Sequence, residues 1–224
     1  YNTIFDNSVD PNQWEMWIYN DGRLSFRIAS GYLLYDLDEL QGPNAWYHVA
    51  VTWSKNGILA NCRLYINGEL KTVNNSMGWV DPGTEIFLGG NLNTRGNGKL
   101  DEFCLWDIEI PPGQIRENMH LTLTGNEPGL VSYWQFNEGA GNTTVDPIGG
   151  NNGILHNMDP DDWVTSTVPV GGGSSFTHIV ETTGNYDFTG TGLSIEFTEK
   201  TGTDTIVVSK LSLAPNHFPT ITLL

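Results

Sequence analysis

Basic residues are scarce in this sequence. Ten Lys and Arg stand against 26 Asp and Glu, which gives a formal net charge of −16 at pH 7. Binding to nucleic acid requires a basic surface that displaces counterions from phosphates, and adsorption to an anionic membrane also requires positive charge. The composition therefore argues against a nucleic-acid partner and against anionic membranes. An acidic surface instead suits divalent cations, neutral sugars or simple solubility.

Cysteines and long apolar runs are also scarce. No apolar stretch approaches the roughly 20 residues of a membrane-spanning helix, so membrane insertion is not predicted. The two cysteines, Cys62 and Cys104, lie outside any C-x-x-C pair, which argues against a thiolate metal site or a redox centre. Cys62 shares its alternation with Leu64 and Ile66 and is predicted to face a core. We predict two free thiols, with a disulfide between them as the alternative.

Helix-forming blocks are few, and turn residues are many. Gly occurs 26 times, and Gly, Asn, Thr and Asp separate short apolar runs that contain eight Trp, eight Tyr and nine Phe. Turn signals that recur about every 8–12 residues are typical of β-sandwiches and barrels. Large aromatic side chains supply much of the apolar surface that such a core buries. The sequence therefore predicts an all-β fold of two antiparallel sheets.

Individual strands and turns can be assigned from period-two alternation and turn residues. Two hairpins are predicted, one at 14–28 around Asn20-Asp21-Gly22 and one at 62–73 around Asn67-Gly68. Further elements are predicted as strands at 46–53, 85–89, 99–106 and 130–136, a helix at 112–119, an Asn- and Gly-rich turn cluster at 146–153 and an extended piece at 162–168.

Several of these segments together resemble a known family. The segments that carry the resemblance are WYHVAVTW at 46–53, LYINGEL at 64–70, FLGGN at 87–91 followed by GKLDEFCLW at 98–106, and the closing stretch 121–155. In order and spacing they resemble the laminin-G-like jelly-roll domains of the concanavalin A-like lectin/glucanase superfamily, as found in bacterial surface and secreted proteins. The resemblance implies a jelly roll and a non-catalytic, extracellular recognition or adhesion function. The opening strand of the family has no counterpart in the sequence.

Composition divides the chain near residue 170. Val170-Gly171-Gly172-Gly173-Ser174-Ser175 is typical of a flexible linker, and the Thr-rich alternation that follows differs from the preceding sequence. We predict a laminin-G-like jelly roll over 1–169, and over 170–224 a linker with the start of a second, truncated β-rich domain. Strand-like sequence at both ends leads us to expect a fragment of a longer secreted or cell-surface protein. Other domains of that chain would then be partners.

Two predicted loops combine aromatic rings with amides and charged groups, the usual composition of a sugar site. The predicted ligand-binding residues are Tyr32, Trp79, Asn91, Asn93 and Arg95. The expected partner is a glycan or a cell-surface protein. The alternative is that Trp79 and Tyr32 pack at the rim of the sandwich and the Asn residues serve only as turn formers.

The resemblance also implies a structural Ca²⁺ ion. Asp101 stands where related jelly rolls often place a calcium ligand, and Asn137 and Glu138 follow a strand that could end at the same corner. Hard cations are bound by several carboxylate, amide and carbonyl oxygens. The alternative is that Asp101 caps a loop and Glu138 is solvated.

Catalytic motifs are absent from the sequence. There is no G-x-S-x-G, H-E-x-x-H or phosphate-binding glycine loop, and His48 is predicted to be a satisfied sheet residue. Retaining glycosidases place two carboxylates about 5–5.5 Å apart. The nearest pair, Asp107 and Glu109, lacks the third acid of the jelly-roll glucanases and runs into Pro111. No catalytic residue is therefore predicted. A hydrolase or lyase of the same superfamily and a ligand-free spacer remain as alternatives, and two carboxylates converging on the concave face would favour hydrolysis.

Overall fold

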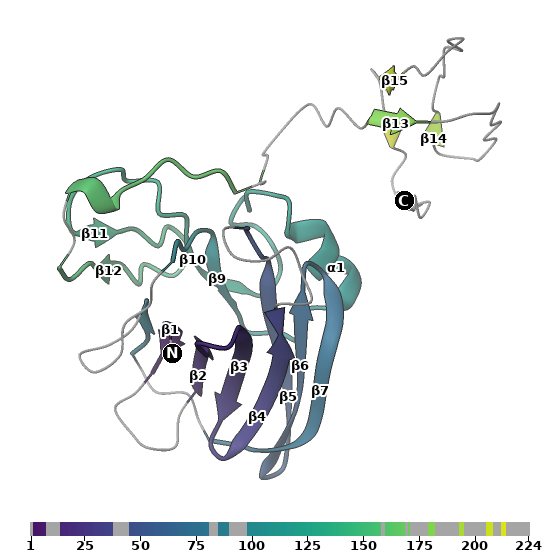
Figure 1. Cartoon of the computed structure of the whole chain (residues 1–224), viewed down its shortest axis with the longest axis vertical. Helices are drawn as coiled ribbons and strands as arrows, with labels where there is room; N and C mark the ends of the chain where they lie inside the picture. The colour runs from purple at the N-terminus through teal and green to yellow at the C-terminus, as the bar shows by residue number, and fades with distance from the viewer. Residues whose placement is uncertain are drawn as a thin grey trace. The chain divides into compact units, whose positions relative to one another are not determined.

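The computed structural model describes residues 2–7, 14–37, 45–80, 85–89, 98–157, 160–168 and 170, and the backbone of four short strands after residue 178. The chain forms two compact units, which comprise residues 1–172 and 173–224 (Figure 1). Every strand pairing in the described residues is antiparallel and helices are few, as the sequence predicts. Within the described residues, no helix has the length and hydrophobicity of a membrane-spanning segment.

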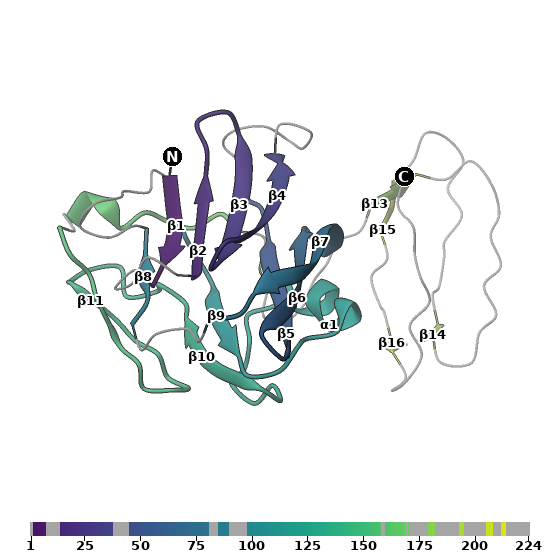
Figure 2. The ribbon, with the colours of Figure 1, turned by 90° about the horizontal axis from the view of Figure 1, so that it is seen from below.

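Unit 1 contains a five-stranded sheet, of which β1 to β4 lie side by side in Figure 1 and Figure 2. Its strand order is β4-β3-β2-β1-β8. The bounds are β1 Asn2–Asp6, β2 Trp14–Ile18, β3 Arg23–Ile28, β4 Gly31–Asp36 and β8 Phe87–Leu88. The predicted hairpin at 14–28 is β2–β3, and Gly22 in its turn has the positive φ of 84° that glycine tolerates.

A three-stranded sheet, in the order β5-β6-β7, forms the second layer. The bounds are β5 Val49–Asn56, β6 Leu59–Ile66 and β7 Glu69–Gly78. The second predicted hairpin is β6–β7, with Asn67 and Gly68 both at positive φ. The predicted strand at 46–53 starts three residues late, because the His48 N–H donates to the side chain of Asn67 at 3.0 Å and its carbonyl accepts from the Asn67 N–H.

The two layers enclose one hydrophobic core. The buried members of this core cluster are Trp14, Met16, Leu24, Phe26, Ile28, Leu33, Ala60, Cys62, Leu64, Ile66 and Met77. Trp14 meets Trp53 and Trp79 edge to face, with ring centroids 4.6 and 5.4 Å apart. Such edge-to-face pairs are a favoured aromatic geometry. Cys62 faces this core as predicted, and both cysteines are free.

The remaining elements of unit 1 follow the sandwich strands in sequence. Their bounds are β9 Phe103–Trp106, α1 Pro112–Asn118, β10 Leu130–Trp134, β11 Thr143–Thr144, β12 Gly153–Ile154 and a 3₁₀ turn at Pro160–Asp162. The predicted helix is confirmed, with proline at its first position and Ile115 buried. The strands predicted at 85–89, 99–106 and 130–136 are shorter than expected, and 163–168 forms no strand.

Unit 2 contains four short strands, β13 Ile179–Glu181, β14 Leu193–Ser194, β15 Thr205–Val207 and β16 Ser212–Leu213. They pair as β13 with β15 and β14 with β16, both antiparallel.

Candidate functional site

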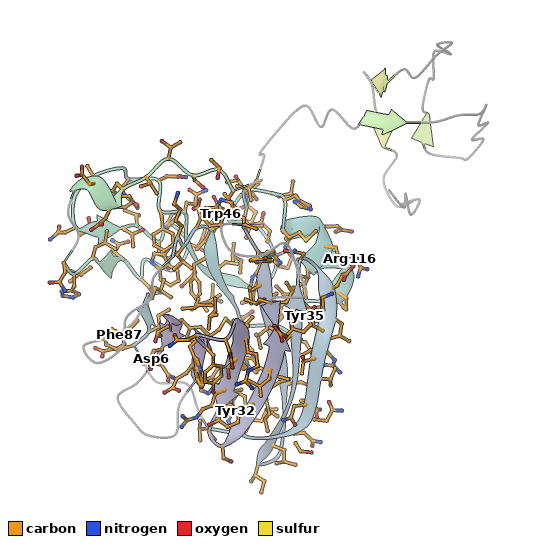
Figure 3. All side chains as sticks on the ribbon, viewed as in Figure 1. Asp6, Tyr32, Tyr35, Trp46, Phe87 and Arg116 are labelled. Carbon is orange, nitrogen blue, oxygen red and sulfur yellow. The ribbon has the colours of Figure 1, made fainter. Side chains whose placement is uncertain are left out.

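The five-stranded sheet has a second face, which points away from the core. Because side chains alternate along a strand, the residues between the core positions share this face, which we call the outer face. Its residues, from the cross-strand register, are Thr3, Asp6, Glu15, Trp17, Ser25, Arg27, Tyr32, Leu34, Arg23 and Asp36. Figure 3 labels two of these residues, Asp6 of β1 and Tyr32 of β4.

Trp17 occupies the middle of the outer face. It is only 7% exposed, yet it is not part of the core cluster. Its ring meets Tyr19 at 5.7 Å and Tyr32 at 6.2 Å between centroids, both edge to face. Three aromatic rings from β2, its turn and β4 therefore lie together outside the core. Tyr32 is the accessible member, with 42% of its surface exposed.

Two arginines of β3 stack on the outer tyrosines. The guanidinium of Arg23 lies 5.1 Å from the centroid of Tyr19, and that of Arg27 lies 6.0 Å from the centroid of Tyr32. Cations at these distances are attracted to the negative face of an aromatic ring. Each tyrosine thus presents a flat apolar ring beside a planar group of hydrogen-bond donors.

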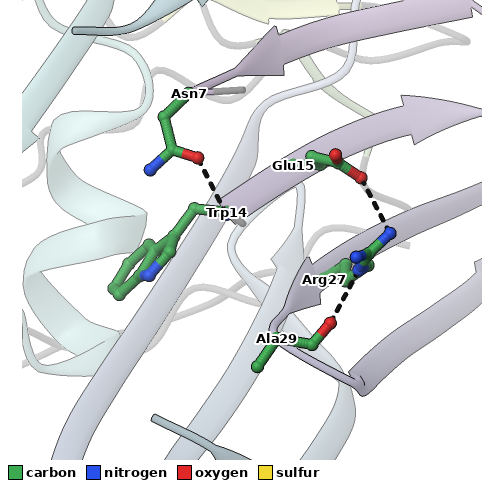
Figure 4. A network of polar contacts seen from close by, with 5 residues as sticks. All are labelled: Asn7, Trp14, Glu15, Arg27 and Ala29. Atoms are coloured by element: carbon green, nitrogen blue, oxygen red, sulfur yellow. Dashed lines mark hydrogen bonds and ion pairs between the residues drawn. The ribbon is translucent and has the colours of Figure 1, made fainter. Parts of the chain in front are cut away.

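Each of the two arginines pairs with a carboxylate, and Arg27 also donates to a backbone carbonyl. Arg23 pairs with Asp21 at 2.8 Å, and this hydrogen bond lowers the pKa of Asp21. Arg27 pairs with Glu15 at 3.3 Å and donates through Nε to the carbonyl of Ala29 at 2.7 Å (Figure 4). The Arg27 guanidinium, with two partners and 24% of its side chain exposed, is therefore held before any ligand arrives, which reduces the entropy lost on binding.

Two carboxylates, Asp6 and Glu15, are direct cross-strand neighbours on the outer face. Partial burial raises the pKa of Glu15, the positive charge of Arg27 opposes that rise, and the negative charge of Asp6 adds to it. Two neighbouring carboxylates on one face of a sheet are the feature that would favour a glycoside hydrolase.

Two hydroxyl groups on the outer face lack hydrogen-bond partners. Thr3 and Ser25 flank Trp17 in the cross-strand register, are 5% and 0% exposed, and have no partner for Oγ1 and Oγ respectively. Leu34 continues this row on β4 and is 42% exposed, so the row reaches solvent at that end. Buried polar groups without partners are uncommon and often mark functional positions.

The predicted ligand-binding residues separate into two groups. Tyr32 lies on the outer face, as described. Trp79 packs against the core cluster with its ring beside Trp14, and the Lys55 ammonium lies 5.0 Å from its centroid. Asn91, Asn93 and Arg95 lie outside the described residues. The predicted grouping of these three residues with Trp79 and Tyr32 therefore stays a prediction.

The predicted calcium ligands are engaged in local contacts. Asp101 accepts the N–H of Glu102 at 3.0 Å, and Glu138 accepts from the hydroxyl of Thr144 at 3.1 Å and the N–H of Val145 at 2.8 Å. Among the described residues, no group of three His, Cys, Asp or Glu side chains is arranged to hold a metal ion. Because Ca²⁺ also accepts amide and backbone carbonyl oxygens, calcium binding at Asp101 stays a prediction.

The surroundings of Asp101 are nevertheless polar and partly buried. Burial, together with the negative charge of Asp101, raises the pKa of Glu102 to about 7. The hydroxyl of Tyr133 donates to the Glu102 carboxylate and accepts the N–H of Leu123 at 3.3 Å. This network ties β9 to β10 and to the preceding loop.

The two carboxylates considered for catalysis, Asp107 and Glu109, are both exposed. Glu109 forms an ion pair with Arg63 at 2.6 Å, and the backbone of Asp107 bonds to Gly129. His48 precedes β5 rather than lying in it, and its Nδ1 is buried without a hydrogen-bond partner. The prediction of a satisfied sheet histidine is therefore wrong, because the ring is desolvated where the chain enters the sheet.

The central residues of the outer face were not identified from the sequence. A signal was present, since Trp17 alternates with the core positions of β2 and shares its parity with Glu15 and Tyr19. A tryptophan among the outward positions of an amphipathic strand indicates a contact outside the core. Arg23 and Arg27 occupy alternate positions of the adjacent strand β3 that also point away from the core.

The comparisons with known proteins agree with this fold. A family model described as the concanavalin A-like lectin/glucanases superfamily, of laminin G type, matches residues 1–116. No curated protein and no solved structure matches the chain. The chain therefore belongs to the laminin G-like group of the concanavalin A-like lectin/glucanase superfamily, and the resemblance drawn from its motifs is confirmed.

Proposed function

We propose that unit 1 is a non-catalytic extracellular recognition module that binds carbohydrate on the outer face of its five-stranded sheet. The observation that carries this proposal is the cluster of Trp17, Tyr19 and Tyr32 with two arginines stacked on its tyrosines. We propose a secreted or cell-surface location, in keeping with the extracellular setting of many laminin G-like domains.

The chemistry of a sugar matches the outer face. A pyranose ring has apolar C–H faces that pack on aromatic side chains, and its hydroxyl groups each donate and accept hydrogen bonds. Guanidinium and carboxylate groups are planar and bind two neighbouring oxygens or hydroxyls at once. Arg27 and Glu15 supply both kinds of group next to Tyr32.

Tyr32→Ala tests the site directly. We expect the full 224-residue chain to bind an immobilised polysaccharide at least about tenfold more weakly after this change, because a loss of about 1.4 kcal/mol of ring contact is tenfold in affinity. Tyr32→Phe should keep most of the affinity. A glycan array identifies the ligand, and isothermal titration calorimetry then measures the variants.

Val73→Ala serves as the matched control, because Val73 is 44% exposed on β7, in the other sheet. It should leave binding unchanged. If Tyr32→Ala and Val73→Ala bind equally well, the outer face is not the site. If the chain binds no glycan, a spacer without a ligand is the better description.

Glycoside hydrolysis is the second candidate function, and the pair Asp6 and Glu15 favours it. Burial raises the pKa of Glu15, which suits an acid catalyst, but the positive charge of Arg27 opposes that rise. We expect no release of reducing ends when the chain is incubated with the polysaccharide that it binds. Release that Glu15→Gln abolishes would replace the recognition proposal with an enzymatic one.

Calcium remains a proposal that rests on the superfamily. If Asp101, Asn137 and Glu138 bind an ion, chelation should lower the melting temperature by about 3 °C or more, because a ligand that binds only the native state stabilises it. Asp101→Ala should remove this sensitivity, and Asp161→Ala, at an exposed residue of the 3₁₀ turn, should keep it. An unchanged melting temperature with chelator would end the calcium hypothesis.

A further inference from the structure

We infer that the ligand of the outer face is an uncharged, hydroxyl-rich glycan rather than a sulfated or uronate polysaccharide. This inference rests on the proposed function and names the chemical class that the site accepts.

The outer face carries more carboxylates than guanidinium groups. Among the described residues of the outer face and its β2–β3 turn, the charged groups are the carboxylates Asp6, Glu15, Asp21 and Asp36 and the guanidinium groups Arg23 and Arg27. Four negative charges and two positive charges leave a net charge of −2. The chain as a whole carries −16. An anionic polysaccharide therefore approaches a surface of its own sign.

Both arginines of the outer face already pair with a carboxylate. Arg23 donates to Asp21 through Nε at 3.0 Å as well as pairing through Nη2 at 2.8 Å. Arg27 is held between Glu15 and the carbonyl of Ala29. A sulfate or uronate group would compete with Asp21 or Glu15 for the arginine. The carboxylate that lost its arginine would then lie unpaired beside the bound anion. Unpaired like charges at close range weaken binding.

The outer face also has groups that can contact an uncharged sugar. The hydroxyls of Thr3 and Ser25 are buried beside Trp17, so a ligand reaches the exposed ring of Tyr32 and the carboxylates of Glu15 and Asp36 instead. The carboxylates accept from sugar hydroxyls, which a sulfate cannot supply. The exposed ring of Tyr32 packs on a pyranose face irrespective of charge. The hydroxyl groups of a neutral sugar therefore complement the carboxylates, and its C–H face complements the Tyr32 ring.

The test compares polysaccharides of different charge on the full chain. The neutral probes are β-glucan, mannan and xylan, the anionic probes are heparin and polygalacturonate, and chitosan is the cationic probe. We expect binding to at least one neutral probe, with an affinity that changes less than about twofold between 0.05 and 0.5 M NaCl, because salt screens only charged contacts. Tyr32→Ala should weaken that binding at least about tenfold.

A charge-altered variant sharpens the comparison. Asp36→Asn removes one negative charge at the exposed end of β4, directly opposite Arg23 in the register. This change should strengthen binding to heparin and polygalacturonate relative to the parent chain, because one charge of their own sign is removed from the face. Strong binding to heparin, polygalacturonate or chitosan alone, weakened by Tyr32→Ala, would overturn the inference while keeping the outer face as the site. Neutral binding that Tyr32→Ala does not weaken would overturn the proposed function itself.

Discussion

Replacing Asp146 with alanine is expected to lower the free energy of unfolding of unit 1 by at least about 3 kcal/mol, because several buried N–H groups lose their acceptor. The Asp146 side chain is 2% exposed, which makes it one of the most buried charged groups described. Its Oδ1 accepts the N–H groups of Tyr133, Ile148 and Gly149, each at 3.0 Å, and its Oδ2 accepts the N–H of Asn151 at 3.2 Å. The carboxylate joins β10 to the turn cluster at 146–153.

The acid dependence of stability has a defined sign at this residue. Burial alone would raise the pKa of Asp146, but hydrogen bonds from Gly149, Ser132, Ile148 and Asn151 outweigh it and hold the pKa below 3.8. A carboxyl whose folded pKa is depressed stabilises the fold above its unfolded pKa, and this contribution is lost as the pH falls through the folded value. Asp146→Ala should therefore become less destabilising, relative to the parent, as the pH falls below 3.8.

Urea unfolding followed by tryptophan fluorescence measures this effect. All eight tryptophans lie within residues 1–172, so the signal reports unit 1 alone. Asp146→Asn keeps one acceptor oxygen and should lose less than Asp146→Ala. Asp161→Ala, at an exposed aspartate, should change the unfolding free energy by no more than about 0.5 kcal/mol. Equal stability of Asp146→Ala and Asp161→Ala would show that the hydrogen bonds contribute nothing.

Acidification from pH 6.5 to pH 4 is expected to destabilise unit 1 through His48 by up to about 3 kcal/mol, at 1.36 kcal/mol per pKa unit. Burial, with a smaller contribution from the charge of His120, lowers the pKa of His48 from 6.5 to about 4. A histidine with a depressed folded pKa favours the neutral ring. Its stabilising contribution is complete above pH 6.5, is lost progressively as the pH falls from 6.5 to 4, and is absent below pH 4.

The experiment is a comparison of pH profiles, because other groups also titrate in this range. His48→Gln should flatten the dependence of unfolding free energy between pH 4 and 6.5, measured by urea unfolding at intervals of half a pH unit. His156→Gln is the matched control, since His156 is exposed, and its profile should follow that of the parent. Superimposable profiles for all three proteins would refute the assignment to His48.

Local sequence determined the elements that depend on neighbouring residues. The hairpins β2–β3 and β6–β7 form where Asp21-Gly22 and Asn67-Gly68 provide positive φ. Alternation also placed Cys62 in the core, and proline marked the start of α1. The boundary of β5 was wrong, because the contact of His48 with Asn67 joins residues 19 positions apart and no local pattern encodes it.

The residues that meet on the outer face and around Asp146 are brought together by contacts between strands that are distant in the sequence. Alternation separates the two faces of a strand, and it therefore marks Trp17 and Arg27 as outward residues. It does not reveal that β4 brings Tyr32 under Arg27, because strand order is set by which apolar faces bury each other best. Asp146 was identified only as part of a turn, because the N–H of Tyr133 comes from another strand.

The all-β class, the family, the two main hairpins and the acidic charge can be predicted from the amino-acid sequence, since these follow from composition and from interactions within a few residues. The gathering of aromatic rings and paired arginines on the outer face, and the burial of Asp146 and His48, become evident from the folded structure alone. Burial and cross-strand neighbours arise when distant segments pack, and packing depends on the whole set of side chains at once.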